Sequence, residues 1–348
     1  MENKTRHEMS AIYSEVILPN TILLVLGTLI GIVGNLLILF LYTFGLKDTA
    51  DQRFFIPVLA LVDTLGCLVS VIFYLMDNYF LFDFPSAILC QILSFFMCFT
   101  SGCSGHLLLV IALQRYFLIC RPLGRQMTSY IRMVTVLVLF VGTFVYSLPL
   151  FLTSGIRSSN KVFLHKTVAA GNCVLSVKVG PEAMVYFVIL FLITIINIVL
   201  IAGFYIPVTK TIYQHIKMKN RRRSTMYNVR MSIAAPSTVS TFSESTTSAG
   251  SAKSTNIPEM APYAKTQINI MFLAIITVYV FSYLPSFVIL LITYTKHDFD
   301  YLQLSPIGIN AWIFSARLIF LNHIVNPFIY GYFDVKLRFE LRRIFCRK

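Results

Sequence analysis

The sequence predicts an all-α membrane protein, a bundle of seven transmembrane helices followed by a short amphipathic eighth helix. Three observations lead to this prediction. Of the 348 residues, 57% are hydrophobic and only 13% are charged, whereas a soluble domain is about 45–50% apolar and about 25% charged. The apolar residues gather into seven long runs, and the basic residues gather between alternate runs. A lipid bilayer is the solvent in which such a composition is stable.

Each apolar run is long enough to cross the hydrocarbon core of a bilayer, which takes about 20 helical residues. The third and fifth runs exceed this minimum, so we expect them to tilt or to protrude. Prolines inside several runs predict kinks, which neighbouring helices tolerate in a membrane. The runs are 16–44, 54–76, 88–120, 133–153, 183–216, 266–295 and 304–333, and the prolines are Pro57, Pro149, Pro207, Pro285 and Pro327.

The remaining segments are polar. Residues 1–17 are predicted to form an extracellular tail, and 18–333 to form the transmembrane domain. Within that domain, 218–262 is rich in serine and threonine and has too few apolar residues to build a core, so it is expected to be a disordered cytoplasmic loop. In the last segment, 334–348, Leu337, Leu341 and Ile344 share one face, which predicts an amphipathic helix on the inner membrane surface.

The net charge of +14 is distributed unevenly along the chain. Of the 29 lysine and arginine residues, 21 fall on the side that holds the segments after the first, third, fifth and seventh runs. Positive loops face the cytoplasm, so the N-terminus is expected outside and the C-terminus inside. This pattern predicts a multi-pass protein of the plasma membrane. Nucleic acid is excluded as a partner, because the sequence has neither zinc-finger spacing nor a basic recognition helix.

Five short motifs then occur in a fixed order, each on the corresponding apolar run. Together they resemble those of the rhodopsin-like (class A) G-protein-coupled receptors, over nearly the whole chain from Gly34 onward. The motifs are Asn326-Pro327-Phe328-Ile329-Tyr330 (the family's NPxxY), Gly34-Asn35 in the first helix, Leu59-Ala60-Leu61-Val62-Asp63 in the second, Gln114-Arg115-Tyr116 in place of the DRY triplet, and Cys90, which lies 25 residues before Arg115.

The chain departs from this family at several positions. Tyr283 stands two residues before Pro285, where the family usually has tryptophan. Counted from Tyr205, which matches the family's inner tyrosine of the fifth helix, Asn197 replaces the usual proline. These departures leave the subfamily open.

Asp63 is the only acidic residue within an apolar run, and an ionisable residue at membrane depth is functional by default. The resemblance implies that Ser104, Asn322 and Asn326 face it, with Asn35 as a neighbour. A carboxylate with hydroxyl and amide oxygens suits a small hard cation, so we expect an allosteric sodium ion and no other cofactor. The alternative is a purely structural polar network, and the atypical His323 beside Asn322 could disturb the ion site.

Modification sites are predicted on both sides of the membrane. Cys90 and Cys173 both lie on the oxidising face, where the resemblance implies a disulfide that holds the second outer loop over the third helix. Asn3 begins an Asn-Lys-Thr glycosylation sequon. Cys346 follows the amphipathic helix and is a palmitoylation candidate, although an unmodified tail cysteine is the alternative.

The resemblance also places a ligand pocket among the outer halves of the helices. Met97 stands where amine receptors carry aspartate, and Phe320 stands where opsins carry the retinal lysine, so a monoamine and a Schiff-base chromophore are not expected. Arg317 could contact a ligand carboxylate, or it could pair internally or snorkel. The expected pocket residues are Met97, Ser101, Tyr283, Phe287, Trp312 and Arg317.

We therefore expect a receptor, and no enzyme, that binds a neuropeptide or peptide hormone and activates a heterotrimeric G protein. Arrestin, a receptor kinase and the lipid bilayer are the further expected partners. The alternatives are a chemosensory receptor for a small molecule and, from another class, a membrane transporter, although no internal repeat is visible. The residues expected to carry coupling and activation are Gln114, Arg115, Tyr116, Tyr205, Tyr283, Pro285, Asn326, Pro327 and Tyr330.

Overall fold

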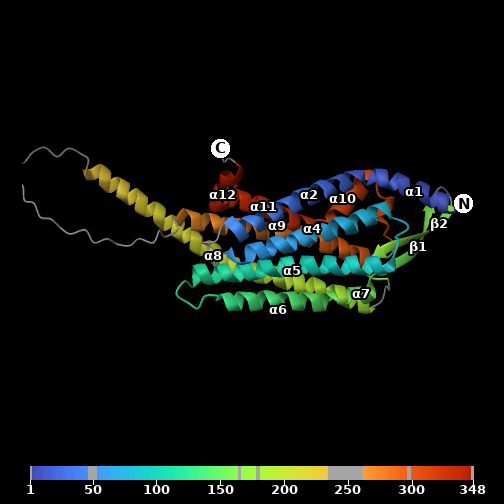
Figure 1. Ribbon diagram of the computed structural model, residues 1–348, viewed down its shortest axis with the longest axis horizontal. Coiled ribbons are helices and arrows are strands. Elements are labelled where there is room, and N and C mark those ends of the chain that lie inside the picture. The colour runs from blue at the N-terminus through green and yellow to red at the C-terminus, as the bar shows by residue number, and fades with distance from the viewer. Residues whose placement is uncertain are drawn as a thin grey trace, which may run out of the picture.

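The computed structural model describes residues 2–45, 53–163, 166–177, 181–233, 262–295 and 299–345. Long helices run side by side along the long axis of the molecule, and the N-terminus and the last helix, α12 (Val335–Phe345), lie at opposite ends (Figure 1). The long helices are α2 (Leu18–Phe40), α4 (Phe55–Tyr79), α5 (Ala87–Cys120), α6 (Ser129–Ser147), α8 (Pro181–Ile233) and α9 (Pro262–Thr295), together with the successive pair α10 (Pro306–Ala316) and α11 (Ile319–Phe333).

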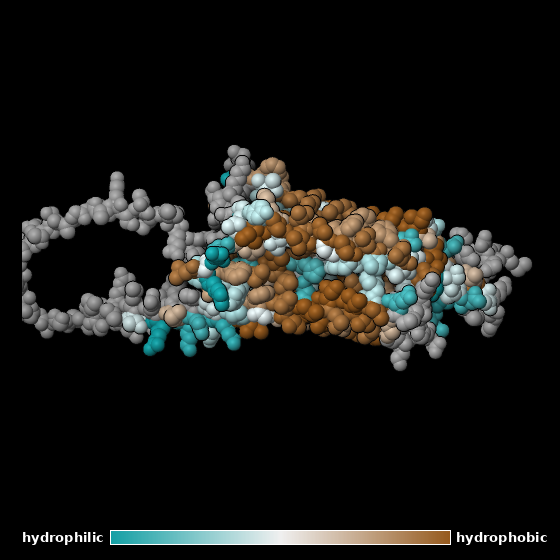
Figure 2. Space-filling view, turned by 90° about the horizontal axis from the view of Figure 1, so that it is seen from below, coloured by the Kyte–Doolittle hydropathy of each residue, from teal (hydrophilic) through white to brown (hydrophobic). Residues whose placement is uncertain are grey.

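The described part of the chain has six helical segments that are long and apolar enough to cross a membrane, and α10 with α11 makes a seventh if the bent pair counts as one span. Large apolar side chains are exposed along these helices, as at Val33 and Leu137. Hydrophobic residues accordingly cover most of the visible surface between polar groups at the two ends (Figure 2). The prediction of a seven-transmembrane bundle is confirmed.

Side-chain caps set where several helices begin. Ser86 accepts a hydrogen bond from the Leu89 backbone N–H at the start of α5, and Thr128 accepts one from Ile131 at the start of α6, each over 3.3 Å. Ser305 caps α10 in the same way, with Pro306 in the first turn. These are the residue types that satisfy the unpaired N–H groups of a helix start.

The largest buried cluster lies where α4, α5, α9 and α11 meet. It contains Leu59, Leu107, Ile111, Ile275 and Tyr330, none of them more than 2% exposed. Arg115 and Gln114 belong to the same turn of α5 as Ile111 and Ala112, which pack in this cluster. The core therefore fixes the position of the third-helix motif.

The end of the bundle that is expected outside contains a helix and a β hairpin, where the sequence predicted a polar tail. Residues Glu2–Val16 form helix α1, and a hairpin of β1 (Gly155–Phe163) and β2 (Lys166–Val174) lies beside it. Met9 is 2% exposed and packs with Leu81, Phe82 and Val168. Met9 and Tyr13 are four residues apart, so they share one face of the helix, and this stripe explains why the segment folds.

The inner end corrects the predicted bounds of the cytoplasmic loop. We expected disorder from residue 218, but α8 continues to Ile233. Residues 218–233 contain neither proline nor glycine and include four arginine residues, three methionine residues and one lysine, which favour helix. Residues 234–261, which hold most of the serine and threonine, lie outside the described part of the chain.

The seventh span has a break that the prolines did not predict. Helices α10 and α11 meet at an angle of 67° around Arg317 and Leu318, not at Pro327. Ser286 of α9 accepts a hydrogen bond from the Ile319 N–H over 3.2 Å and donates one to the Ser315 carbonyl over 3.2 Å. A side chain of the neighbouring helix thus forms hydrogen bonds with backbone groups that the interrupted helix leaves without an internal partner.

Candidate functional site

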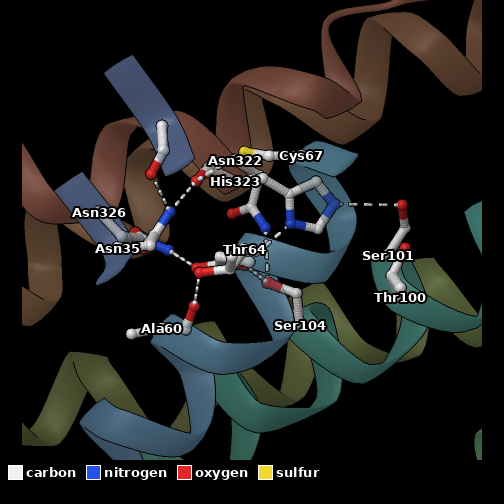
Figure 3. Close-up of polar contacts among 12 residues, drawn as sticks. Asn35, Ala60, Thr64, Cys67, Thr100, Ser101, Ser104, Asn322, His323 and Asn326 are labelled. Atoms are coloured by element: carbon white, nitrogen blue, oxygen red, sulfur yellow. Dashed lines mark hydrogen bonds and ion pairs between the residues drawn. The ribbon is translucent and has the colours of Figure 1, made fainter. Parts of the chain in front are cut away.

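Asp63 is fully buried within a polar cluster of the bundle. Figure 3 shows that the side chains of Ser104, His323 and Asn326, which contact it, gather from different helices. The Oδ1 atom of Asp63 accepts a hydrogen bond from the Ser104 hydroxyl over 2.8 Å and lies 2.8 Å from Nδ1 of His323. Its Oδ2 atom accepts from the Asn326 amide over 2.6 Å. All four side chains are at most 1% exposed, so the carboxylate is stabilised by protein groups and not by bulk water.

The other two predicted members lie in the same cluster. Asn322 donates from its amide to the Ser104 hydroxyl oxygen over 2.8 Å. Asn35 donates to the backbone carbonyls of Gly31 and His323 over 2.9 and 2.8 Å. The structure therefore brings together all five residues that the resemblance assigned to this site. It adds His323 as a direct partner of the carboxylate, a role that the sequence did not predict.

The fit of a sodium ion depends on which oxygens remain available. The amide oxygens of Asn35, Asn322 and Asn326 are buried and have no hydrogen-bond partner among the described residues. These are suitable ligands for a hard cation. However, the carboxylate that would hold the ion already has one oxygen shared between Ser104 and His323. Both carboxylate oxygens thus already have partners within the protein, and nothing in the structure tests the predicted sodium ion.

The inner motif residues lie close to one another. Arg115 is 5% exposed, and Tyr205 and Tyr330 are buried in the cluster that contains Ile111 and Ala112, one turn before Arg115. Both phenol oxygens are buried without a hydrogen-bond partner among the described residues. Gln114, at 4% exposed, precedes Arg115 in α5, and the Tyr116 ring packs 5.7 Å from Phe204 of α8. This arrangement unites residues of α5, α8 and α11.

The sixth-helix residues connect to a second polar network. Tyr283, two residues before Pro285, donates its hydroxyl to the Ser101 carbonyl over 2.7 Å. One turn earlier, Tyr279 donates to Oδ1 of Asn197 over 3.2 Å, and Asn197 donates to Nδ1 of His106 over 2.7 Å. The positions that depart from the family pattern, Asn197 and Tyr283, are therefore linked to α5. The sequence did not predict the contribution of His106 and Tyr279.

The six predicted pocket residues contact different neighbours within the described part of the chain. Ser101 lies 3.4 Å from His323, and Met97 accepts a hydrogen bond from Ser70 at its sulfur. Phe287 lines a small apolar cavity between α8 and α9 with Phe187, Phe191 and other side chains. Trp312 packs against Phe299, at 4.7 Å, and Tyr301, at 6.4 Å. Their role in ligand binding stays a prediction.

Arg317 has internal partners. Its guanidinium lies 2.9 Å from the Asp77 carboxylate and donates to Oδ1 of Asn78 over 2.7 Å. The Tyr74 ring lies beneath it at 4.7 Å. Of the two interpretations, internal pairing is the one that these contacts favour. One guanidinium nitrogen, Nη1, has no hydrogen-bond partner among the described residues, so a contact with a ligand is still open.

The Arg317–Asp77 contact gives a testable prediction. Both side chains are partly exposed, at 13% and 30%, so the pair is expected to contribute only about 0.5–1 kcal/mol. In a double-mutant cycle, Arg317→Ala and Asp77→Ala should each lower the melting temperature of the purified protein by a few degrees. The double variant should be no less stable than the worse single variant. Strictly additive losses would show that the pair does not form.

An ion pair that the sequence did not predict lies at the inner end. Arg53 and Asp334 are 4% and 1% exposed and lie 3.0 Å apart. Asp334 also accepts hydrogen bonds from the Tyr42 hydroxyl, over 2.6 Å, and from the Leu337 N–H at the start of α12. One carboxylate thus joins the first span, the start of α4 and the amphipathic helix.

The predicted disulfide is confirmed: Cys90, at the outer end of α5, is bonded to Cys173 of β2. Cys173 pairs across the hairpin with Ile156, which packs beside the bond. Asn3 lies within α1, and its glycosylation stays a prediction. Cys346 lies outside the described residues.

Comparison with known proteins agrees with this architecture. Residues 34–330 match the family described as 7 transmembrane receptor (rhodopsin family). The neuropeptide Y receptor type 4 of Rattus norvegicus is 30% identical over 145 residues, which are 40% of this chain and 37% of the relative. That of Mus musculus is 28% identical over 125 residues, 35% of this chain and 32% of the relative. The matched segment thus spans about a third of each relative's length.

Among solved structures, squid rhodopsin superimposes with a TM-score of 0.65, covering 97% of this chain and 86% of that protein. The sequence identity is 15%, so this likeness establishes the fold alone.

Proposed function

This chain belongs to the rhodopsin family of seven-transmembrane receptors, and we propose that it binds an extracellular peptide and activates a heterotrimeric G protein. It is a receptor and not an enzyme. The observation that best supports coupling is the position of Arg115, which lies with Tyr205 and Tyr330 where three helices meet. These side chains would line the cavity that a G protein enters.

A peptide is favoured as the ligand because both curated relatives are named as neuropeptide Y receptors. Met97 supports this choice, since it supplies no carboxylate for an amine. A small chemosensory ligand is the alternative. Met97, Ser101, Tyr283, Phe287, Trp312 and Arg317 are the proposed ligand contacts.

We assign the chain to the plasma membrane, with the N-terminus outside and the C-terminus in the cytoplasm. The distribution of lysine and arginine supports this orientation. Palmitoylation at Cys346 would add a lipid anchor beside α12, and glycosylation at Asn3 would modify the outer face.

Activation would be a population shift between two packings of the bundle. Ligand contacts near Tyr283 would favour a state in which the sixth span, α9, pivots near Pro285. The inner ends of α5, α9 and α11 would then separate. The Tyr283–Ser101 and Tyr279–Asn197 hydrogen bonds connect the pivot to α5 and α8 and support this route.

A peptide-library screen in transfected cells, with second-messenger readout, tests the proposal. A peptide that raises the messenger in cells with the wild-type receptor, and not in cells expressing Arg115→Ala at equal surface density, would support it. If small molecules activate the receptor and no peptide does, the chemosensory alternative holds.

The resting state gives a second prediction. In many family members an acid precedes the third-helix arginine and pairs with it, whereas here that position is the neutral Gln114. Gln114→Asp is expected to lower ligand-free signalling roughly two- to five-fold, because a carboxylate beside Arg115 contributes up to about 1 kcal/mol to the closed state. Gln114→Asn is the matched control, because asparagine has the shape of aspartate without its charge. The measurement is basal second-messenger level at equal surface expression.

Two outcomes would contradict this prediction. Basal signalling already at background in the wild type would show that packing alone keeps the receptor closed, and an equal effect of Asn and Asp would show that charge is irrelevant. Many family members also carry an acid at the inner end of the sixth helix, and here that position, 20 residues before Pro285, is Lys265. Lys265 lies in α9, and its side chain is outside the described residues.

A receptor kinase and arrestin are proposed as further partners. The kinase would phosphorylate the serine- and threonine-rich loop, and arrestin would bind the phosphorylated loop. Residues 331–348 contain no serine or threonine, whereas residues 232–255 contain thirteen, so the loop is the segment proposed to carry the phosphates. Each phosphate would add about −1.5 to −2 charge for a basic partner to recognise. Deleting residues 232–255 should abolish agonist-dependent arrestin recruitment and leave G-protein signalling intact. Unchanged recruitment in an arrestin-proximity assay would refute this proposal.

A further inference from the structure

The imidazole of His323 is packed against the carboxylate of Asp63 without access to solvent. Nδ1 lies 2.8 Å from Oδ1, and both side chains are 0% exposed. On the other side of the ring, Nε2 lies 3.4 Å from the Ser101 hydroxyl. The ring therefore spans the space between α4 and α5, next to the carboxylate that would hold a cation.

The surrounding hydrogen bonds converge on the carboxylate of Asp63. The Ser104 oxygen accepts from the Asn322 amide, so the Ser104 hydroxyl proton is directed to Oδ1 of Asp63. The amide of Asn326 donates to Oδ2. Both oxygens of Asp63 thus accept hydrogen bonds from neighbouring side chains, and Nδ1 of His323 lies at hydrogen-bond distance from Oδ1.

The backbone of α4 is shaped to admit the ring. Gly66, one turn after Asp63, faces His323, and a Cβ atom at this position would lie 2.7 Å from Nδ1 and Cε1 and 2.8 Å from Nε2. Real Cβ contacts are essentially never this short. Gly66 and His323 are therefore complementary in shape, and the imidazole occupies a place formed for it.

We propose that the imidazole of His323 takes the place of a cation at Asp63, so that the wild-type protein does not respond to sodium. Removing the ring should create a sodium site. It would remove one of the two groups that contact Oδ1 and open the space that the ring fills, and the unpaired amide oxygens of Asn35, Asn322 and Asn326 would supply further ligands. This inference concerns a residue of the chain itself, and it holds whatever the ligand or the coupling partner is.

The test is the thermal stability of the purified full-length protein in detergent micelles. Melting temperatures are compared in sodium chloride and in potassium or choline chloride at equal ionic strength, which removes general salt effects. The wild type should show no sodium-specific change. The melting temperature of His323→Ser should rise by roughly 3 °C or more in sodium, because an ion that binds only the folded state stabilises that state. His323→Ser combined with Asp63→Asn should lose that rise.

Two results would overturn the proposal. One is a sodium-specific rise in the wild type that Asp63→Asn abolishes, since the ion would then bind beside the imidazole. The other is a folded His323→Ser protein without any response to sodium. If His323→Ser does not fold, His323→Asn replaces it, and the wild-type measurement still decides the first point.

The fit of the ring has an independent check in the same assay. Gly66→Ala should lower the melting temperature of the wild type, because the added methyl group clashes with the imidazole. The same substitution should cost much less in the His323→Ser background. Equal losses in both backgrounds would show that Gly66 does not accommodate the ring.

Discussion

Replacing either Cys90 or Cys173 with serine is expected to remove most of the receptor from the cell surface, to about a tenth of the wild-type level or less. The disulfide joins segments 83 residues apart, and loss of a native disulfide typically costs 2–5 kcal/mol. The loss is large because the bond joins the β hairpin to α5. Phe84, Cys90 and Leu93 are buried in the cluster that Ile156 and Cys173 cover.

Surface and total receptor can be measured by flow cytometry of intact and permeabilised cells. The double variant should be no worse than either single one, because each substitution already breaks the bond. Cys120→Ser is the matched control, since Cys120 is a free thiol at the other end of the same helix. Normal surface levels in one of the single variants would show that the bond is dispensable.

The membrane spans could be predicted from the sequence because their cause is local. A run of about 20 apolar residues is visible in the sequence, and such a run is stable as a helix in lipid without contacts from distant segments. The break between α10 and α11 has another kind of cause. The backbone groups at the break form hydrogen bonds with Ser286, which belongs to the preceding span. No pattern within 304–333 indicates the break.

Helix α1 shows why composition alone does not predict every helix. Residues 1–17 look polar, because the face that packs is a narrow stripe that includes Met9 and Tyr13. That stripe is stable only against Leu81, Phe82 and Val168, which come from elsewhere in the chain. Composition averages over such a stripe, so it predicted a tail where the structure has a helix.

The members of the Asp63 cluster could be predicted from the family pattern, but their contacts could not. Each polar residue falls on the expected helix. Which atom approaches the carboxylate depends on the direction of the His323 ring, and that direction depends on Gly66 of another helix. A glycine in an apolar run gave no signal of this role.

The Arg53–Asp334 pair was missed for a similar reason, since 281 residues separate its members, and it gives the last prediction. Asp334→Ala is expected to destabilise the protein by about 3–5 kcal/mol, because it leaves the buried guanidinium of Arg53 without its counter-ion. The Tyr42 hydroxyl and the first turn of α12 lose an acceptor at the same time. The melting temperature in micelles should therefore fall by roughly 10 °C.

Two further variants separate the ion pair from general damage to α12. Arg342→Ala removes a charge of the same helix, but the Arg342 side chain is exposed to solvent, so its effect should be close to zero. Arg53→Met combined with Asp334→Leu should recover much of the stability lost in Asp334→Ala, because two apolar side chains leave no buried charge unpaired. A double variant as unstable as Asp334→Ala would show that the Tyr42 and α12 hydrogen bonds, and not the unpaired charge, account for the loss.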